Sequence, residues 1–136
     1  MIEDIMLLNL TDLSAEPLQQ QIVRQIRSKI LSGELITGAD LPSIRGLARD
    51  YHVSVITVQR AYELLVRDGL ILSRRGKGFF VAELTKDGKK EMARQRLRDN
   101  LEPILFEALA DGLSPADVED IIEKIISDHI ESDREE

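Results

Sequence analysis

Hydrophobic residues recur at helical spacing in three consecutive segments between Pro17 and Asp68. The first segment begins at Pro17, a favourable residue for a first helical turn, and ends at Gly33, which favours a helix end. The second and third are each introduced by a serine that can cap a helix, Ser43 and Ser54. Their apolar residues share one helical face: Leu18, Ile22, Ile26 and Ile30; Ile44, Leu47, Ala48 and Tyr51; Val58, Ala61, Tyr62 and Leu65. Two short helices joined by a tight turn after a longer helix are typical of a helix-turn-helix.

After Gly69 the hydrophobic residues occur in short runs typical of β-strands. The runs 70–72 and 79–81 have the composition of short strands. Between them, the segment 73–78 contains two glycines suited to a hairpin turn. The same segment carries three cations, Arg74, Arg75 and Lys77. We therefore expect a β-hairpin with a basic tip, a wing, directly after the third helix.

The remainder of the chain is predicted to be helical. Thr85 can cap a long helix, which Pro103 is expected to kink or split near Glu102. Gly112 ends this segment, and 114–117 has the residues of a new helix start. Both helices carry apolar stripes that two helices cannot bury on each other alone, so we expect an interface between two copies of the chain. The interface is predicted to contain Leu97, Leu101, Leu105, Val118, Ile121, Ile122, Ile125 and Ile126. A monomer whose stripes pack onto the first helix is the alternative.

These elements predict a mainly α fold with a small β-hairpin. Residues 1–16 form an N-terminal extension, 17–83 a winged helix-turn-helix, and 84–136 a helical dimerisation region made of two helices.

The net charge of −7 is unevenly distributed. Residues 17–82 carry ten basic and five acidic side chains, whereas both ends of the chain are acidic. A phosphate-binding surface needs only local positive charge, so the middle of the chain suits nucleic acid.

The absence of cysteine excludes a disulfide framework, a thiolate zinc site and a cysteine nucleophile. No apolar run approaches the roughly 18 residues of a membrane span. Acids near the start, Glu3 and Asp4, argue against an export signal, so a cytoplasmic protein without membrane contact is expected.

Several groups of residues stand in an order typical of one protein family. They are Leu41-Pro42-Ser43-Ile44-Arg45, Leu47-Ala48, Val53-Ser54, Thr57-Val58, Ala61-Tyr62, Leu65, Asp68-Gly69-Leu70-Ile71 and Arg75-Gly76-Lys77-Gly78-Phe79-Phe80-Val81. In these residues the stretch from Pro17 to Val81 resembles the DNA-binding domain of the GntR family of transcription regulators. The Ala61-Tyr62 pair and the short helical tail resemble its YtrA subfamily, which implies dimerisation through two C-terminal helices and suggests control of transporter operons. The family often has Glu at Gly46 and Arg at Val55 and Gln59, so an operator sequence known for a relative does not transfer to this chain.

The third helix is the predicted recognition element, because its N-terminal residues face outward and such residues contact base edges. Gln59 can bond an adenine, Arg60 a guanine or a phosphate, and Val55 and Ile56 can cover thymine methyls. Packing for the two aliphatic residues and plain solvation for Arg60 are the alternatives. Glu63 is expected to orient Arg60 or Arg67.

A second predicted group of DNA contacts lies at helix N-termini and on the wing. Ser43, Ser54 and Thr57 stand where free N–H groups suit phosphate, although capping alone also explains the serines. The resemblance assigns Arg45 to DNA. The wing residues Arg74, Arg75, Gly76 and Lys77 are expected at the minor groove, with a solvated turn as the alternative.

The sequence therefore predicts a regulator, most simply a repressor, that binds a double-stranded DNA operator. A homodimer implies a palindromic operator with half-sites about one helical turn (roughly 10 bp), or a multiple, apart. A winged-helix module that binds protein instead of DNA is the alternative. Enzyme activity is not expected, because His52 and His129 lack the partner spacing of a metal site or a catalytic triad. No metal or cofactor is expected, and a small-molecule effector stays an open question.

Overall fold

The computed structural model describes residues 7–135. Residues 1–6, which contain the two acids used to argue against an export signal, lie outside the described residues. The chain divides into two compact units, 1–92 and 93–136, and the division falls inside one long helix. Each unit is described by itself.

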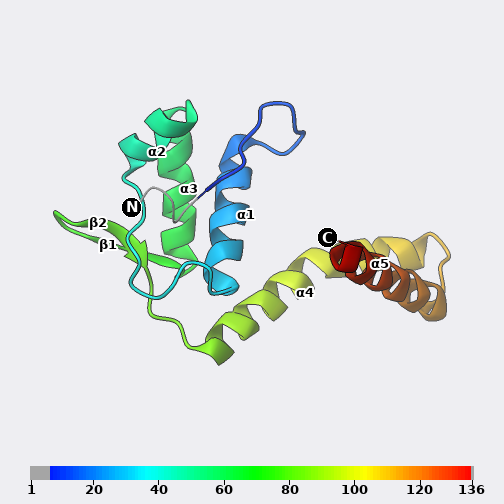
Figure 1. Ribbon diagram of the computed structural model, residues 1–136. Coiled ribbons are helices and arrows are strands. Elements are labelled where there is room, and N and C mark those ends of the chain that lie inside the picture. The colour runs from blue at the N-terminus through cyan, green and yellow to red at the C-terminus, as the bar shows by residue number, and fades with distance from the viewer. Residues whose placement is uncertain (1–6, 136) are drawn as a thin grey trace. The chain divides into compact units, whose positions relative to one another are not determined.

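Unit 1 contains the elements of the predicted winged helix-turn-helix (Figure 1). Its elements follow in the expected order: α1 (Leu18–Leu31), α2 (Ile44–Tyr51), α3 (Val55–Arg67), β1 (Ile71–Arg74) and β2 (Gly78–Val81). The apolar faces read from the sequence point inward. All four predicted core residues of α3, Val58, Ala61, Tyr62 and Leu65, are fully buried.

Tyr62 joins three parts of unit 1. Its hydroxyl donates a hydrogen bond of 2.7 Å to the carbonyl oxygen of Pro42, in the loop before α2. Its ring meets the Phe79 ring of β2 edge-on, with centroids 4.9 Å apart. Burial raises the pKa of Tyr62 well above its usual range, so the hydroxyl remains protonated and can donate. One side chain of α3 therefore fixes both the entry to α2 and the wing.

The two serine caps form as predicted. The Ser43 hydroxyl oxygen accepts a hydrogen bond from the Gly46 amide at 3.0 Å. The Ser54 hydroxyl oxygen accepts one from the Thr57 amide at 3.1 Å. Between the two helices, His52 has a left-handed φ of 54°, which ends α2 and makes the turn tight. His52 therefore lies in the turn between the two helices.

The wing is a two-stranded antiparallel hairpin in which Ile71 pairs with Val81 and Arg74 with Gly78. Gly76 and Gly78 both have a φ of 79°, a conformation that favours glycine. A contact absent from the sequence analysis widens the hairpin, because Asp40 forms an isolated antiparallel bridge with Phe80. The segment before α2 is therefore tied to β2.

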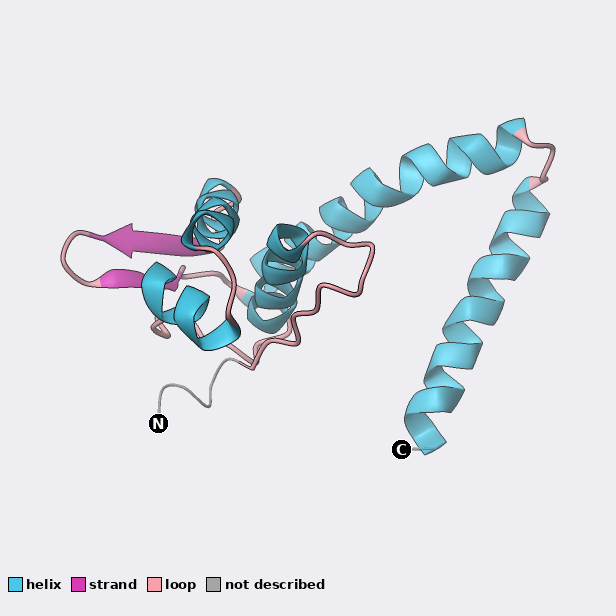
Figure 2. Ribbon diagram, turned by 90° about the horizontal axis from the view of Figure 1, so that it is seen from above, coloured by secondary structure: helices cyan, strands magenta, loops and turns pink. Residues whose placement is uncertain are grey.

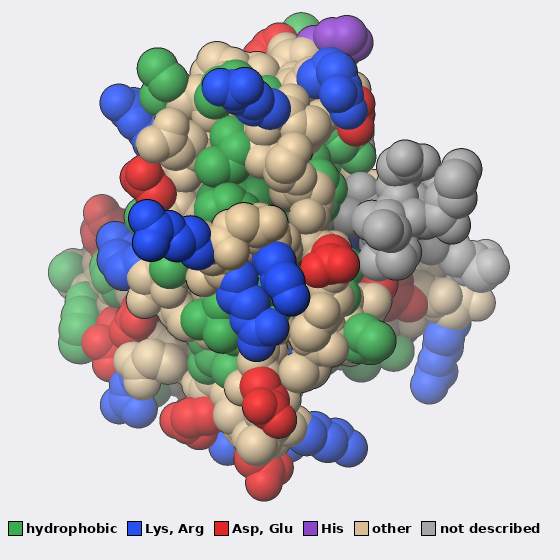
Figure 3. Space-filling model, turned by 90° about the vertical axis from the view of Figure 1, so that its left-hand side faces the viewer, with side chains coloured by type: hydrophobic (Ala, Val, Ile, Leu, Met, Phe, Trp, Pro, Cys, Tyr) green, Lys and Arg blue, Asp and Glu red, His purple; other side chains and the backbone are tan. Residues whose placement is uncertain are grey.

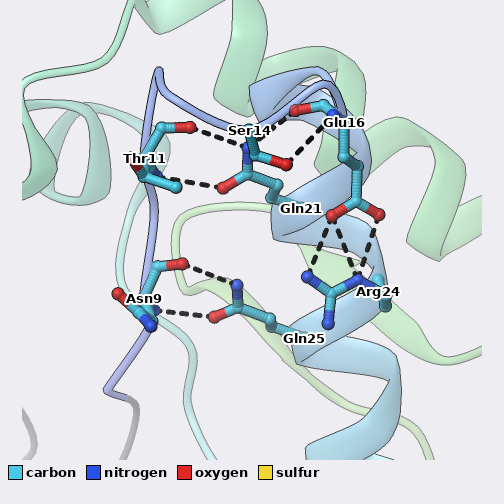
Figure 4. Close-up of polar contacts among 7 residues, drawn as sticks. All are labelled: Asn9, Thr11, Ser14, Glu16, Gln21, Arg24 and Gln25. Atoms are coloured by element: carbon cyan, nitrogen blue, oxygen red, sulfur yellow. Dashed lines mark hydrogen bonds and ion pairs between the residues drawn. The ribbon is translucent and has the colours of Figure 1, made fainter.

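The segment 7–16 before α1 is held against that helix by two glutamine side chains (Figure 4). The buried Gln21 amide accepts from the Thr11 N–H at 3.0 Å and donates to the Thr11 and Glu16 carbonyl oxygens at 2.9 and 2.7 Å. The Gln25 amide accepts from the Asn9 N–H at 2.7 Å and donates to the Asn9 carbonyl at 2.9 Å. Gln21 and Gln25 are one helical turn apart, and each side-chain amide bonds both the N–H and the C=O of one residue in the segment.

This segment also reaches the core of unit 1. Leu8 is buried among the core residues, and its N–H donates to the Tyr51 hydroxyl of α2 at 2.8 Å. The sequence analysis treated residues 1–16 only as an extension, whereas their described part belongs to the fold of unit 1.

Two long helices, α4 (Lys86–Ala110) and α5 (Pro115–Glu135), account for the rest of the chain. The Thr85 hydroxyl oxygen accepts from the Gly88 amide at 2.9 Å and caps α4, as expected. At the start of α5 the Asp117 carboxylate accepts a hydrogen bond from the Ser114 N–H. Hydrogen bonding with the backbone and the side chain of Ser114 lowers the pKa of Asp117. The helix α4 runs unbroken through Pro103, so the proline does not split it. No helix among residues 7–135 has the length and apolar composition of a membrane span.

Gln21→Ala should lower the free energy of unfolding by about 1–3 kcal/mol, because it leaves partly buried backbone groups of Thr11 and Glu16 without partners. Chemical denaturation measures this loss, and hydrogen exchange should show faster exchange at the Thr11 amide. The matched control is Gln20→Ala, the same change at an exposed position of α1, with an expected effect within about 0.5 kcal/mol. Equal losses in the two variants would contradict the anchoring role of Gln21.

Candidate nucleic-acid interface

The outward face of α3 begins with two exposed aliphatic residues. Val55 is 45% exposed and Ile56 is 60% exposed, although the opposite face of the same helix is fully buried. Packing within unit 1 therefore does not cover these two side chains. Gln59 and Arg60 follow one turn later and are also exposed. This face presents apolar, amide and cationic groups within two helical turns.

Glu63 interacts with Gln59 instead of with an arginine. The Gln59 side-chain amide donates to the Glu63 carboxylate at 3.3 Å, at the i, i+4 spacing of neighbours on a helix. Arg67 pairs with the adjacent Asp68 at 3.3 Å. The expectation that Glu63 orients Arg60 or Arg67 was wrong, because the residue one turn before Glu63 is the one within hydrogen-bond distance. The Glu63 carboxylate therefore holds the Gln59 side-chain amide through one of its N–H groups.

The N-termini of α2 and α3 present both serine caps at the surface. Ser43, Arg45 and Ser54 are exposed, and Thr57 is half-buried. The Ser54 and Thr57 hydroxyl oxygens are 2.7 Å apart, so these hydroxyls bond each other in addition to the cap. The first N–H groups of α3 and the exposed Arg45 side chain are the donors best placed to meet a phosphate at this end.

The wing tip carries its cations on a short rigid turn. The Lys77 N–H donates to the Arg74 carbonyl oxygen at 2.9 Å and closes the turn. The Arg74 guanidinium lies over the Phe80 ring, 4.7 Å from its centroid, a cation–π contact that holds this side chain along the strand. Arg75, Gly76 and Lys77 are all exposed at the tip.

Ion pairing separates the ten cations of residues 17–82 into two groups. Arg24, Arg27, Lys29, Arg49 and Arg67 each lie within 3.3 Å of a carboxylate. Within the described part of the chain, no carboxylate pairs with the other five cations of residues 17–82: Arg45, Arg60, Arg74, Arg75 and Lys77. These five are the cations that the sequence analysis assigned to DNA. Lys and Arg side chains stand across the side that carries α2 and the wing (Figure 3).

The predicted dimer residues lie in the second unit and are open to solvent. Leu97 is 63% exposed and Ile125 is 61% exposed, and Ile121, Ile122 and Ile126 are also exposed. Leu101, Leu105 and Val118 are half-buried. The sequence analysis missed Phe106, which is also largely exposed, because it stands outside the stripe that was followed along α4.

Comparison with known proteins identifies a family whose model matches the chain and proteins of similar sequence. The family model for bacterial regulatory proteins of the gntR family matches residues 18–81. Over 115 residues the chain is 30% identical to the HTH-type transcriptional repressor YtrA of Bacillus subtilis, covering 85% of this chain and 88% of that repressor.

Two solved structures are similar over most of their length. A GntR family transcriptional regulator from Listeria monocytogenes has a TM-score of 0.68 at 27% identity, over 82% of this chain and 96% of that one. YtrA from Sulfolobus acidocaldarius, a GntR-family transcription factor, has a TM-score of 0.54 at 30% identity, over 88% of this chain and 97% of that one.

Proposed function

The chain belongs to the GntR family of bacterial regulatory proteins and is a helix-turn-helix transcriptional regulator, and from this premise we propose that it is a homodimeric repressor of a palindromic operator. The observation that carries the proposal is a set of five cations that have no carboxylate partner among residues 7–135: Arg45, Arg60, Arg74, Arg75 and Lys77. An arginine paired within the fold has its charge compensated, whereas one without such a partner can neutralise a phosphate and release counterions.

In the proposed complex α3 enters the major groove. Gln59, held by Glu63, bonds an adenine edge, while Val55 and Ile56 cover thymine methyls. Arg45 and the N–H groups at the start of α3 contact phosphates and fix the orientation of the helix. The wing tip contacts the minor groove or its phosphates through Arg75 and Lys77.

Dimerisation is supported by the apolar side chains of α4 and α5 that stay exposed in one chain. A second copy that covers Leu97, Ile121, Ile125 and their neighbours removes this apolar surface from water. A two-fold dimer presents two recognition helices related by symmetry, and the operator then has two inverted half-sites. Occupancy of such a site within a promoter excludes RNA polymerase, and the relative from Bacillus subtilis is named a repressor.

The first experiment is capture of operator DNA. Purified full-length protein is incubated with fragmented DNA from its own genome at moderate salt, and the retained DNA is sequenced. We expect one enriched inverted repeat, whose spacing gives the distance between half-sites. Retained fragments without a shared sequence would contradict sequence-specific binding, and the absence of binding even at low salt would instead favour a protein-interaction module.

Gln59→Ala should relax the preference at one base pair of each half-site, at a cost of roughly 1–3 kcal/mol for the preferred base. Arg45→Ala is the comparison, because a lost phosphate contact should weaken binding to every sequence about equally. Competition binding with operators that carry single base-pair changes distinguishes the two patterns. An equal loss on all sequences for Gln59→Ala would assign Gln59 to the backbone and not to a base.

Ile122→Glu should dissociate the proposed dimer, because it places a charge within the apolar stripe of α5. Ser127→Glu adds the same charge on the opposite side of α5 and should leave the dimer intact. Analytical ultracentrifugation over a range of concentrations measures the dissociation constants. A sedimentation profile unchanged by Ile122→Glu would remove this stripe from the interface.

A further inference from the structure

The start of α3 and the segment before α1 line a common hollow of about 430 Å³. Thr57 of α3 contributes to its lining, together with Thr11, Asp12, Ser14 and Glu16 of the segment. The beginning of α1 completes the lining. In the proposed complex the start of α3 contacts a phosphate, and Thr57 is among the predicted contacts. A charge on the lining of this hollow therefore acts on the bound DNA.

Both charged groups of the hollow are carboxylates, and only one of them is compensated. The Arg24 guanidinium of α1 donates hydrogen bonds of 2.9, 3.0 and 3.2 Å to the two carboxylate oxygens of Glu16. Asp12 is exposed, and no cation among residues 7–135 forms an ion pair with it. One carboxylate without a counter-charge therefore stands in the hollow that Thr57 shares.

Hydrogen bonds hold the backbone on both sides of Asp12. Figure 2 shows the segment as a loop that leaves the start of α1 and turns back along unit 1. The buried Gln21 side chain bonds the N–H and the C=O of Thr11 at 3.0 and 2.9 Å. The Thr11 hydroxyl oxygen accepts a hydrogen bond from the Leu13 N–H at 3.1 Å. Asp12 therefore has a defined place in the fold and is not carried on a free chain end.

A carboxylate at this place opposes the approach of DNA. The first N–H groups of α3 attract a phosphate, whereas the Asp12 carboxylate repels it. At 0.1 M salt the Debye length is about 10 Å, so groups that share a hollow of this size are incompletely screened from each other. Charges at the rim of an interface act mainly on the association rate and on its salt dependence.

We propose that Asp12 sets the affinity for DNA: held beside the start of α3 by Gln21, its charge weakens the binding of every duplex and lowers the occupancy of the operator at a given protein concentration. This inference rests on the proposed function and goes beyond it by giving the segment before α1 a role in DNA binding. Asp12 acts on phosphates and not on bases, so it leaves the preference for sequence unchanged. Gln21 acts through Asp12 and is a positioning residue.

The test is Asp12→Asn in the full-length protein, which removes the charge and keeps the size of the side chain. At 50 mM salt this variant should bind the captured operator and an unrelated duplex about two- to fivefold more tightly than wild type. At 300 mM salt the gain should fall below about 1.5-fold, because the repulsion is then screened. Fluorescence anisotropy with labelled duplexes measures the dissociation constants, and stopped-flow mixing should show that the association rate carries most of the gain.

The matched control is Glu83→Gln, which makes the same change of net charge. Glu83 is an exposed residue just after β2 that does not line the hollow. This variant should keep its affinity for both duplexes within about 1.5-fold of wild type, because only its contribution to the net charge is lost. Chemical denaturation of each variant checks that unit 1 remains folded.

A double-mutant cycle tests the positioning role of Gln21. In a Gln21→Ala background Thr11 is no longer anchored, so Asp12→Asn should give less than about half of the gain that it gives alone. In a Gln20→Ala background the full gain should remain. A purely structural role of Gln21 would lower the free energy of unfolding and leave the gain from Asp12→Asn unchanged.

Each other outcome overturns the inference in a distinguishable way. An unchanged affinity of Asp12→Asn would show that DNA stays away from the segment. Equal gains for Asp12→Asn and Glu83→Gln would assign the effect to net charge. A gain limited to the operator would assign Asp12 to base recognition, and a weaker affinity would show that its carboxylate supports the interface. A wild-type protein that binds no DNA even at low salt would instead refute the proposed function, before the variants are compared.

Discussion

The burial of Tyr62 inside unit 1 is the constraint on which the geometry of the whole proposed DNA-binding surface depends. The side chain projects from α3, bonds the backbone of Pro42 and packs against Phe79. The three parts of the proposed interface are thus fixed to one another through one residue: the start of α2 after Pro42, the outward face of α3, and the wing. Donors placed this way need little rearrangement on binding, and preorganisation of this kind reduces the entropic cost of association.

Positive and negative side chains are distributed unevenly along the chain, and the net charge does not show this. Of the ten cations in residues 17–82, five are compensated within the fold, and no carboxylate among the described residues pairs with the other five. The helical tail is acidic, which discourages non-specific contact between the tail and DNA while leaving the basic face of the winged helix unaffected. Local placement of charge, and not its total, accounts for the proposed interaction with DNA.

Local signals explain why much of the fold could be predicted from the sequence. Ser43, Ser54 and Thr85 are caps whose hydrogen bonds span three residues, and His52 ends a helix whose periodicity stops at that point. Contacts between distant segments were not predictable. The bridge from Asp40 to Phe80 and the anchoring of Thr11 by Gln21 depend on tertiary packing, and a glutamine in a polar run carries no sign that it is buried.

In the candidate site, too, features set by local sequence were predictable and contacts set by side-chain geometry were not. The outward residues of α3 follow from helical periodicity, because the buried face defines the exposed one. The partner of Glu63 did not follow, since several polar neighbours stand at suitable spacing and only side-chain geometry selects Gln59. Pro103 illustrates a further case: a proline removes one hydrogen bond from a helix, and the surrounding turns of α4 continue past it.

The placement of the tyrosines has a practical consequence for spectroscopy. The chain has two tyrosines and no tryptophan, and both tyrosines, Tyr51 in α2 and Tyr62 in α3, belong to the helix-turn-helix. Tyrosine fluorescence therefore reports on unit 1 alone, whereas the far-ultraviolet dichroism signal includes the long helices α4 and α5. Melting curves recorded by the two methods coincide only if both units unfold together. Any separation between the curves measures directly how independently the DNA-binding unit and the helical tail are folded, without a label or a mutation.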